Sequence, residues 1–73
     1  MSTQMNLQGV KCPVNFIKIR LELEKMKAGE ILEVIIDDGE PIDSVPRSLQ
    51  LEGFEVCRQE PFGENGWLVS VKK

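Results

Sequence analysis

The sequence predicts a small α/β two-layer sandwich with the order β-α-β-α-β-β, a mixed four-stranded sheet and two helices on one face. Its 73 residues suffice for one domain, spanning residues 1–73. Apolar residues recur at helical spacing in one long segment and alternate with polar ones in short segments. Two strand-helix-strand crossovers are expected to be right-handed, which places both helices on the same side of the sheet and leaves the other side open.

The first strand is predicted at Met5–Gln8 and is ended by Gly9. A long helix follows from Cys12-Pro13 to about Lys27, because proline is favoured at the first helical position; Gly29 is its expected C-cap. Spacings of three and four residues give this helix one core-facing side. Its members are Phe16, Ile19, Leu23 and Met26.

A second apolar line lies on another side of the same helix, well away from the core-facing side. Its members are Val14, Ile17 and Leu21. We interpret it as covered by a neighbouring helix. The alternative is an exposed docking patch beside the start of the helix.

The next strand is predicted at Ile31–Ile36, which is rich in β-branched residues, and Asp37-Asp38-Gly39 closes it. Its core side is expected to carry Leu32, Val34 and Ile36, because Glu33 stands on the other side. A second helix is predicted at about Val45–Leu51 with Ser44 as its cap, since Pro46 is unfavourable deep inside a helix.

The last two strands are predicted at Phe54–Gln59 and Trp67–Val71, joined by a hairpin with an Asn65-Gly66 turn. Strict alternation places Cys57 on the side away from the core and Arg58 on the opposite side. We interpret Cys57 as structural, because nothing near it in sequence favours a thiolate.

The composition narrows the chemistry. Net charge is −3, from 9 basic and 12 acidic residues, which disfavours direct binding of nucleic acid. No apolar run is long enough for a membrane span, and no signal peptide is recognisable, so we expect a cytoplasmic protein. Histidine is absent, which excludes His-based catalysis and His metal sites, and two cysteines are too few for a structural zinc site. We therefore expect neither a metal nor an organic cofactor.

Cys12 is the candidate reactive residue. The start of a helix offers free N–H groups and partial positive charge, and Lys11 adds a cation, so both favour the thiolate. Pro13 fixes the backbone beside the sulfur. The alternative is that Cys12 is a small buried hydrophobe, the commonest role of a free cysteine.

Asp37 and Asp38 end a strand, where loops of α/β folds collect functional groups. They are candidates for contact with a partner. A solvated loop start is the plainer interpretation.

The segment Leu7-Gln8-Gly9-Val10-Lys11-Cys12-Pro13 resembles the Leu-x-Gly-Leu-x-Cys-Pro opening of the TusA/SirA sulfur-transfer proteins, and the similarity covers essentially the whole chain. The family fold resembles the C-terminal domain of bacterial translation initiation factor three. The family motif is usually Cys-Pro-x-Pro, and Asn15 stands in place of the second proline, where it keeps a backbone N–H.

The resemblance implies a sulfur carrier that accepts sulfane sulfur as a persulfide on Cys12. The donor would be a cysteine desulfurase or rhodanese-like protein, and the acceptor another protein thiol. Lys11, Pro13 and Asn15 would support the sulfur, while Val14, Ile17, Asp37 and Asp38 are candidates for partner contact. Two alternatives stay open: an interaction or regulatory module in which Cys12 is incidental, and a redox sensor with a Cys12–Cys57 disulfide.

Overall fold

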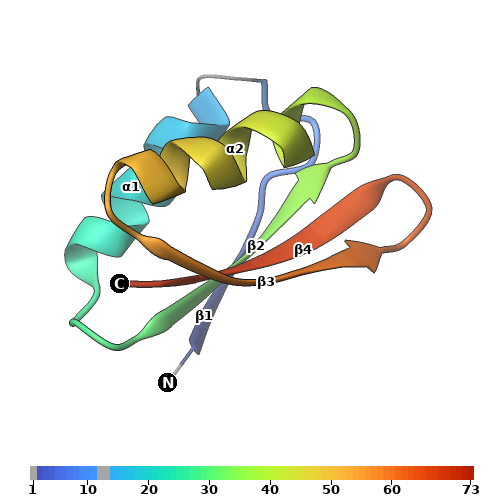
Figure 1. The fold of residues 1–73 in the computed structure, drawn as a ribbon. Coiled ribbons are helices and arrows are strands. Elements are labelled where there is room, and N and C mark those ends of the chain that lie inside the picture. Colours follow the sequence, from blue (N-terminus) through green and yellow to red (C-terminus); the bar gives the residue numbers. More distant parts are fainter. Residues whose placement is uncertain (1, 12–13) are drawn as a thin grey trace.

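The computed structural model describes residues 2–11 and 14–73, and confirms the predicted order of elements (Figure 1). They are β1 (Ser2–Asn6), α1 (Val14–Lys25), β2 (Ile31–Asp37), α2 (Glu40–Leu51), β3 (Glu55–Phe62) and β4 (Gly66–Lys72). Among the described residues, no helix combines the length and the apolar character that crossing a bilayer requires.

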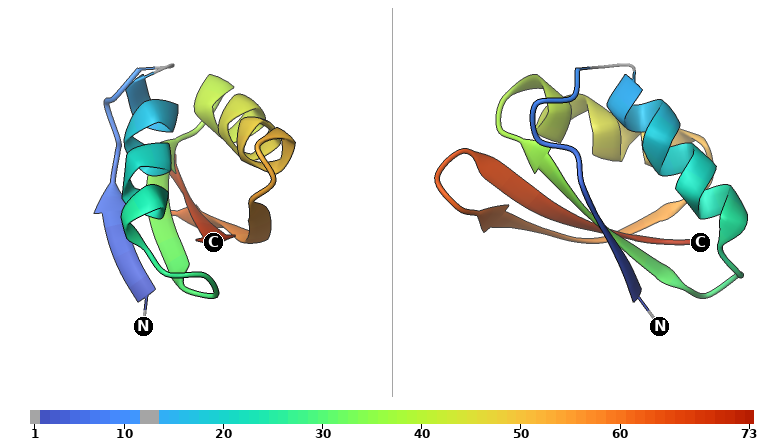
Figure 2. Two further views of the ribbon diagram at one scale, coloured as in Figure 1. Left: turned by 90° about the vertical axis from the view of Figure 1, so that its left-hand side faces the viewer. Right: turned by 180° about the vertical axis from the view of Figure 1, so that it is seen from behind.

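The sheet has the strand order β1-β2-β4-β3. β1 runs parallel to β2, whereas β4 is antiparallel to both of its neighbours, so the sheet is mixed as predicted. Both helices lie side by side on one face of the sheet, which confirms the two-layer sandwich (Figures 1 and 2).

The core fills the space between the helices and the sheet. β2 contributes the three predicted side chains, and opposite them on β4 lie Val69 and Val71, all almost completely buried. The predicted core side of α1 is confirmed as well. Ile19, Leu23 and Met26 are buried, and Phe16 packs against the same cluster.

β1 lies earlier than predicted. It ends at Asn6, whose Oδ1 accepts a hydrogen bond from the N–H of Gln8 at 2.9 Å and turns the chain out of the sheet. The N–H of Leu7 still donates to the carbonyl of Ile35 at 2.8 Å, so one hydrogen bond to β2 persists beyond the end of β1.

α2 begins at Glu40, not at Val45 as predicted, and continues through Pro46. Pro41 occupies the first turn, where a missing N–H costs nothing. Pro46 removes one internal hydrogen bond, but its ring is buried, and burial offsets part of that cost. Ser44 is therefore inside the helix and not its cap, and its hydroxyl donates to the carbonyl of Glu40.

The β3–β4 hairpin does not use the predicted Asn65-Gly66 turn. Its loop is Gly63–Asn65, and Gly63 adopts the positive φ of 67°. Gly66 belongs to β4 and serves a close approach, because a Cβ there would lie 2.8 Å from the carbonyl oxygen of Phe62. The prediction of a turn between β3 and β4 is confirmed, but the glycine with positive φ is Gly63 and not Gly66.

Candidate functional site

The predicted reactive residues Cys12 and Pro13 lie outside the described residues, so the site is defined by what flanks them. Lys11, on one side, is exposed. Its carbonyl accepts a hydrogen bond from the N–H of Asn15 at 3.1 Å, the four-residue bond that an α-helix makes in its first turn. This bond lies directly before α1, which begins at Val14, and the predicted helix start at Cys12-Pro13 lies outside the described residues.

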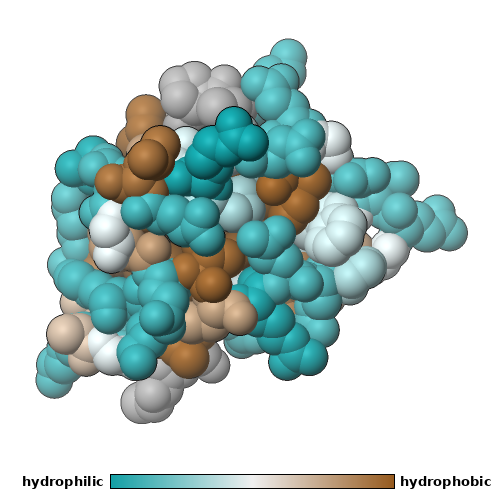
Figure 3. Space-filling model, viewed as in Figure 1, coloured by the Kyte–Doolittle hydropathy of each residue, from teal (hydrophilic) through white to brown (hydrophobic). Residues whose placement is uncertain are grey.

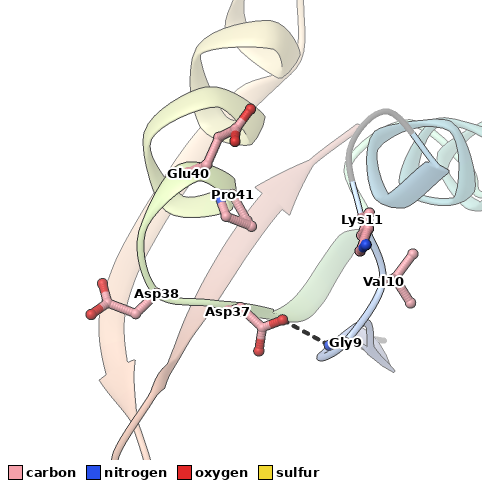
Figure 4. Close-up of a pocket in the computed structure, with 7 residues that line it drawn as sticks. All are labelled: Gly9, Val10, Lys11, Asp37, Asp38, Glu40 and Pro41. Carbon is pink, nitrogen blue, oxygen red and sulfur yellow. Dashed lines mark hydrogen bonds between the residues drawn. The ribbon is translucent and has the colours of Figure 1, made fainter.

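The loop before Lys11 is tied to the end of β2. The N–H of Gly9 donates to Oδ2 of Asp37 at 2.7 Å (Figure 4). Gly9 has a φ of 83°, a conformation that glycine adopts without strain. Asp37 is therefore a tether for the segment that leads into α1, and not the free solvated charge expected from the sequence.

Asp38 serves the hairpin instead. Its Oδ1 accepts from the indole Nε1–H of Trp67 at 3.0 Å, and its own N–H donates to the carbonyl of Asn65 at 3.0 Å. The two adjacent aspartates thus connect β2 to different parts of the chain.

A pocket of about 540 Å³ opens beside these groups (Figure 4). Its lining residues are Gly9, Val10, Lys11, Asp37, Asp38, Glu40 and Pro41. One wall is the segment before Cys12, and the other is the start of α2. The sequence pointed to Lys11 and both aspartates but missed the α2 residues, because the start of that helix was misplaced.

Asn15 lies in the first described turn of α1 and is completely buried, with 0% of its surface exposed. Its Oδ1 accepts from the N–H of Phe16 at 2.7 Å. Its Nδ2 has no hydrogen-bond partner in the part of the chain that the structure describes. The sequence showed that Asn15 keeps a backbone N–H where the motif has a proline, but gave no sign that its carboxamide is buried.

The second apolar line of α1 is exposed: Val14 by 47%, Ile17 by 49% and Leu21 by 53%. The interpretation that a neighbouring helix covers it was wrong, because α2 lies beside α1 over the sheet and leaves this line uncovered (Figure 2). Apolar patches among hydrophilic side chains are visible on the molecular surface (Figure 3). We call Val14, Ile17 and Leu21 the apolar stripe of α1.

Cys57 is a free, exposed thiol at an irregularity of β3, where the register shifts between Val56 and Arg58. Its Sγ lies 3.5 Å from Oε2 of Glu55. Desolvation by neighbouring atoms, with the hydrogen bond and charge of Glu55, raises the pKa of the Cys57 thiol. The added residue also breaks the alternation, so that Arg58 pairs with Ser70 and its predicted side was wrong.

No group of three or more Cys, Asp or Glu side chains in residues 2–11 and 14–73 has the arrangement of a metal site. The chemistry available near Cys12 is that of sulfur, an exposed ammonium group and carboxylates.

The fold and the Lys-Cys-Pro segment that precedes α1 in the chain define a class of small α/β proteins with a cysteine between the first strand and the first helix. The chain belongs to the TusA family, since the family model Sulfurtransferase TusA matches residues 3–73. Two similar proteins are both described as "Putative sulfur carrier protein". The one from Archaeoglobus fulgidus is 46% identical over 69 residues, covering 94% of this chain and 78% of the relative. The one from Thermotoga maritima is 34% identical over 68 residues, covering 93% and 86%.

Proposed function

We propose that this protein is a sulfur carrier that holds sulfane sulfur as a persulfide on Cys12 and passes it to a thiol of another protein. The observation that carries the proposal is the match to the sulfurtransferase family over residues 3–73, a range that includes Cys12. The description of both relatives as sulfur carriers supports it.

The transfer is a thiol exchange that balances without an oxidant, metal or cofactor. The thiolate of Cys12 attacks the terminal sulfur of a donor persulfide, R–S–SH. The S–S bond of the donor breaks, R–S⁻ leaves, and Cys12–S–SH forms. An acceptor thiolate then attacks the terminal sulfur of Cys12–S–SH and releases Cys12 as a thiolate. Each step needs a thiolate as the attacking group.

The surroundings of Cys12 favour the thiolate. α1 begins at Val14, two positions after Cys12, so its first-turn N–H groups and the positive end of its dipole follow Cys12 closely in the chain. The exposed ammonium group of Lys11 adds positive charge. Asp37, which contacts the segment before Cys12, accepts the N–H of Gly9.

The donor and acceptor are proteins, and we propose that they dock on the apolar stripe of α1. Lys18 and Lys25 are exposed and lie seven residues apart on α1, so they form a row on one side of the helix beside the stripe, and the exposed Lys11 precedes the helix in the chain. This row is basic on a chain of net charge −3. The matching partner surface carries apolar side chains bordered by carboxylates. Asp37 and Asp38, at the neighbouring pocket, are candidates for further contacts.

The test is intact mass after incubation with a cysteine desulfurase and cysteine, without reductant. Wild type and Cys57→Ala are expected to gain one sulfur atom, and Cys12→Ala none. Equal gain in Cys12→Ala and wild type would overturn the proposal, as would no gain in wild type with either a desulfurase or a rhodanese as donor.

The exposed apolar stripe also favours a second candidate, a protein-interaction module in which Cys12 takes no part. The two candidates separate in one variant. Cys12→Ser is expected to abolish sulfur loading, whereas a pure interaction module would keep its whole activity in that variant.

A further inference from the structure

The two edge strands of the sheet differ in how they are protected against further pairing. β3, at one edge, carries a register shift between Val56 and Arg58, a proline at position 61 and charged side chains along its length. Natural sheets use these features to prevent another strand from pairing with an edge. β1, at the other edge, has neither charge nor proline and pairs regularly with β2 over all of its residues. In the part of the chain that the structure describes, the edge of β1 is therefore open to a further strand.

The pairing with β2 shows which backbone groups line this edge. The N–H of Leu7 donates to the carbonyl of Ile35 at 2.8 Å, so Leu7 turns its backbone toward β2. Backbone direction alternates along a strand, so Gln4 and Asn6 turn their N–H and carbonyl groups outward. Outside the β1–β2 ladder, no backbone hydrogen bond within residues 2–11 and 14–73 uses these groups. The open edge thus presents two donors and two acceptors.

One flank of α1 is basic and is turned away from α2. Arg20 marks the flank toward α2, because its Nη1 pairs with Oε1 of Glu52, at the end of α2, at 2.9 Å. At about 100° per residue, Lys18 and Lys25 lie about 140–160° around the helix from Arg20. Both lysines are exposed, and Glu22 on their flank is half-buried, so two positive charges stand against one negative charge.

The strand order places β1 on the side of this basic flank. α2 packs on β2 and β3, whereas β1 is the edge strand beyond β2. β1 and α2 accordingly lie on opposite sides of α1 (Figure 2). Met5 of β1 packs against the core under the helices, so the helix side of a strand added beyond β1 would face Lys18 and Lys25.

We propose that the open edge of β1 binds an extended acidic segment of a partner protein as an additional strand, with alternate carboxylates facing Lys18 and Lys25. Main-chain hydrogen bonds to Gln4 and Asn6 hold the segment, and the two lysines select its charge. The proposal goes beyond the proposed function, because this binding requires no sulfur chemistry.

The same charges disfavour a second copy of the chain at this edge. Two β1 strands paired about a two-fold axis would place both α1 helices on the same side of the joined sheet. Lys18 and Lys25 of one copy would then face those of the other, and like charges repel. An acidic segment meets no such repulsion.

The test follows the backbone amide signals of isotope-labelled protein by NMR during titration with two synthetic peptides. One peptide alternates threonine with glutamate and the other threonine with lysine, so that they share a residue that favours extended backbone and differ in charge. We expect the amides of Gln4 and Asn6 to shift with the acidic peptide and not with the basic one. The same shifts are expected in Cys12→Ser, so failure of sulfur loading and failure of this binding are measured separately.

Two pairs of variants test the hydrogen bonds and the charge. Gln4→Pro removes the outward N–H but keeps the pairing with β2, because proline is tolerated where its missing N–H faces away from the sheet. It is expected to weaken binding of the acidic peptide about fivefold, whereas Gln4→Ala keeps the N–H and should bind like wild type. Lys18→Glu is expected to weaken binding about threefold. Arg47→Glu is its matched control, because Arg47 is exposed on α2 and the net charge changes equally.

An absence of shifts at Gln4 and Asn6 with millimolar acidic peptide would overturn the proposal, as would equal binding of the two peptides. Shifts of these amides that depend on protein concentration without peptide would assign the edge to a second copy and overturn it as well. If Gln4→Pro does not fold, Lys18→Glu decides alone, and binding equal to that of Arg47→Glu would contradict the proposed contact.

Discussion

The two cysteines of this chain stand in regions of opposite electrostatic character. In the sequence, Cys12 stands between the exposed Lys11 and α1, which begins at Val14 and whose first-turn N–H groups carry partial positive charge. Cys57 lies in an irregular part of β3 beside the carboxylate of Glu55, and the pKa of its thiol is raised. The proposed carrier role of Cys12 requires ionisation of its thiol, whereas Glu55 opposes ionisation of the Cys57 thiol.

The difference teaches that exposure alone does not make a cysteine a carrier. Cys57 is exposed but has a negative neighbour, which opposes the thiolate that sulfur exchange requires. The helix that follows Cys12 in the chain carries the exposed apolar stripe, our proposed docking surface, whereas β3 is mostly exposed and polar around Cys57.

The largest effect on the difference between the two cysteines is expected from reversing the charge of Lys11, the residue before Cys12. Lys11→Glu is expected to slow alkylation of Cys12 at pH 7 by about tenfold, because a neighbouring negative charge raises the thiol pKa by about one unit. Lys27→Glu is the matched control. Lys27 is also exposed and lies just beyond the C-terminal end of α1, and its substitution makes the same change in net charge. An equal slowing in both variants would show that only net charge matters.

The proposed docking of a partner on the apolar stripe is tested by substituting two exposed leucines. Leu21→Ser is expected to slow sulfur transfer by about fivefold, since half of a leucine side chain contributes about 1 kcal/mol on burial in an interface. The pKa of Cys12 should not move. Leu51→Ser is the matched control, because Leu51 is 82% exposed on α2 and lies outside the stripe. A larger effect at Leu51 would place the docking surface elsewhere.

The tether of the site loop is tested at Asp37. Asp37→Ala is expected to lower the free energy of unfolding by about 1 kcal/mol, because the N–H of Gly9 loses its acceptor. Asp37→Asn keeps an acceptor oxygen and should lose less than half as much in urea unfolding. Equal losses would assign the effect to charge and not to the hydrogen bond.

The smallest expected effect concerns the alkylation rate of Cys57 and is produced by a substitution at Glu55. Glu55→Gln removes the negative charge beside this thiol, so the raised pKa falls toward its ordinary value. Below that pKa the thiolate fraction rises as the pKa falls, so alkylation of Cys57 at pH 8 is expected to accelerate about twofold. Cys12 in the same sample should react at its wild-type rate, and a slower Cys57 would contradict the assigned cause.

Much of this fold was predictable because its periodicities are clear. The alternation in β2 and the three-four spacing in α1 correctly gave the core side of both elements, but not the burial of Ile35 and Asn15. The start of α2 was not predictable from Pro46, since only the tertiary structure shows that the proline ring is buried. The face of the sheet on which Arg58 lies was predicted wrongly, because the register shift in β3 cannot be recognised from the local sequence pattern.

The site was predictable in part. The Lys11-Cys12-Pro13 segment marked the start of α1, but the tether from Asp37 to Gly9 joins residues 28 positions apart and depends on the sheet register. The exposure of the apolar stripe depends on where α2 packs, and the burial of Asn15 contradicts the usual preference of asparagine for the surface. Long-range packing decides each of these features.

The central claim is that the two surroundings make one cysteine a thiolate near neutral pH and keep the other protonated. Its most direct test is alkylation of wild-type protein by brief iodoacetamide pulses between pH 5 and 10, with both cysteines followed by peptide mass. We predict that Cys12 reaches half its maximal rate below about pH 8.5, the ordinary cysteine value, and Cys57 above it. A Cys12 midpoint equal to or higher than that of Cys57 would contradict the account.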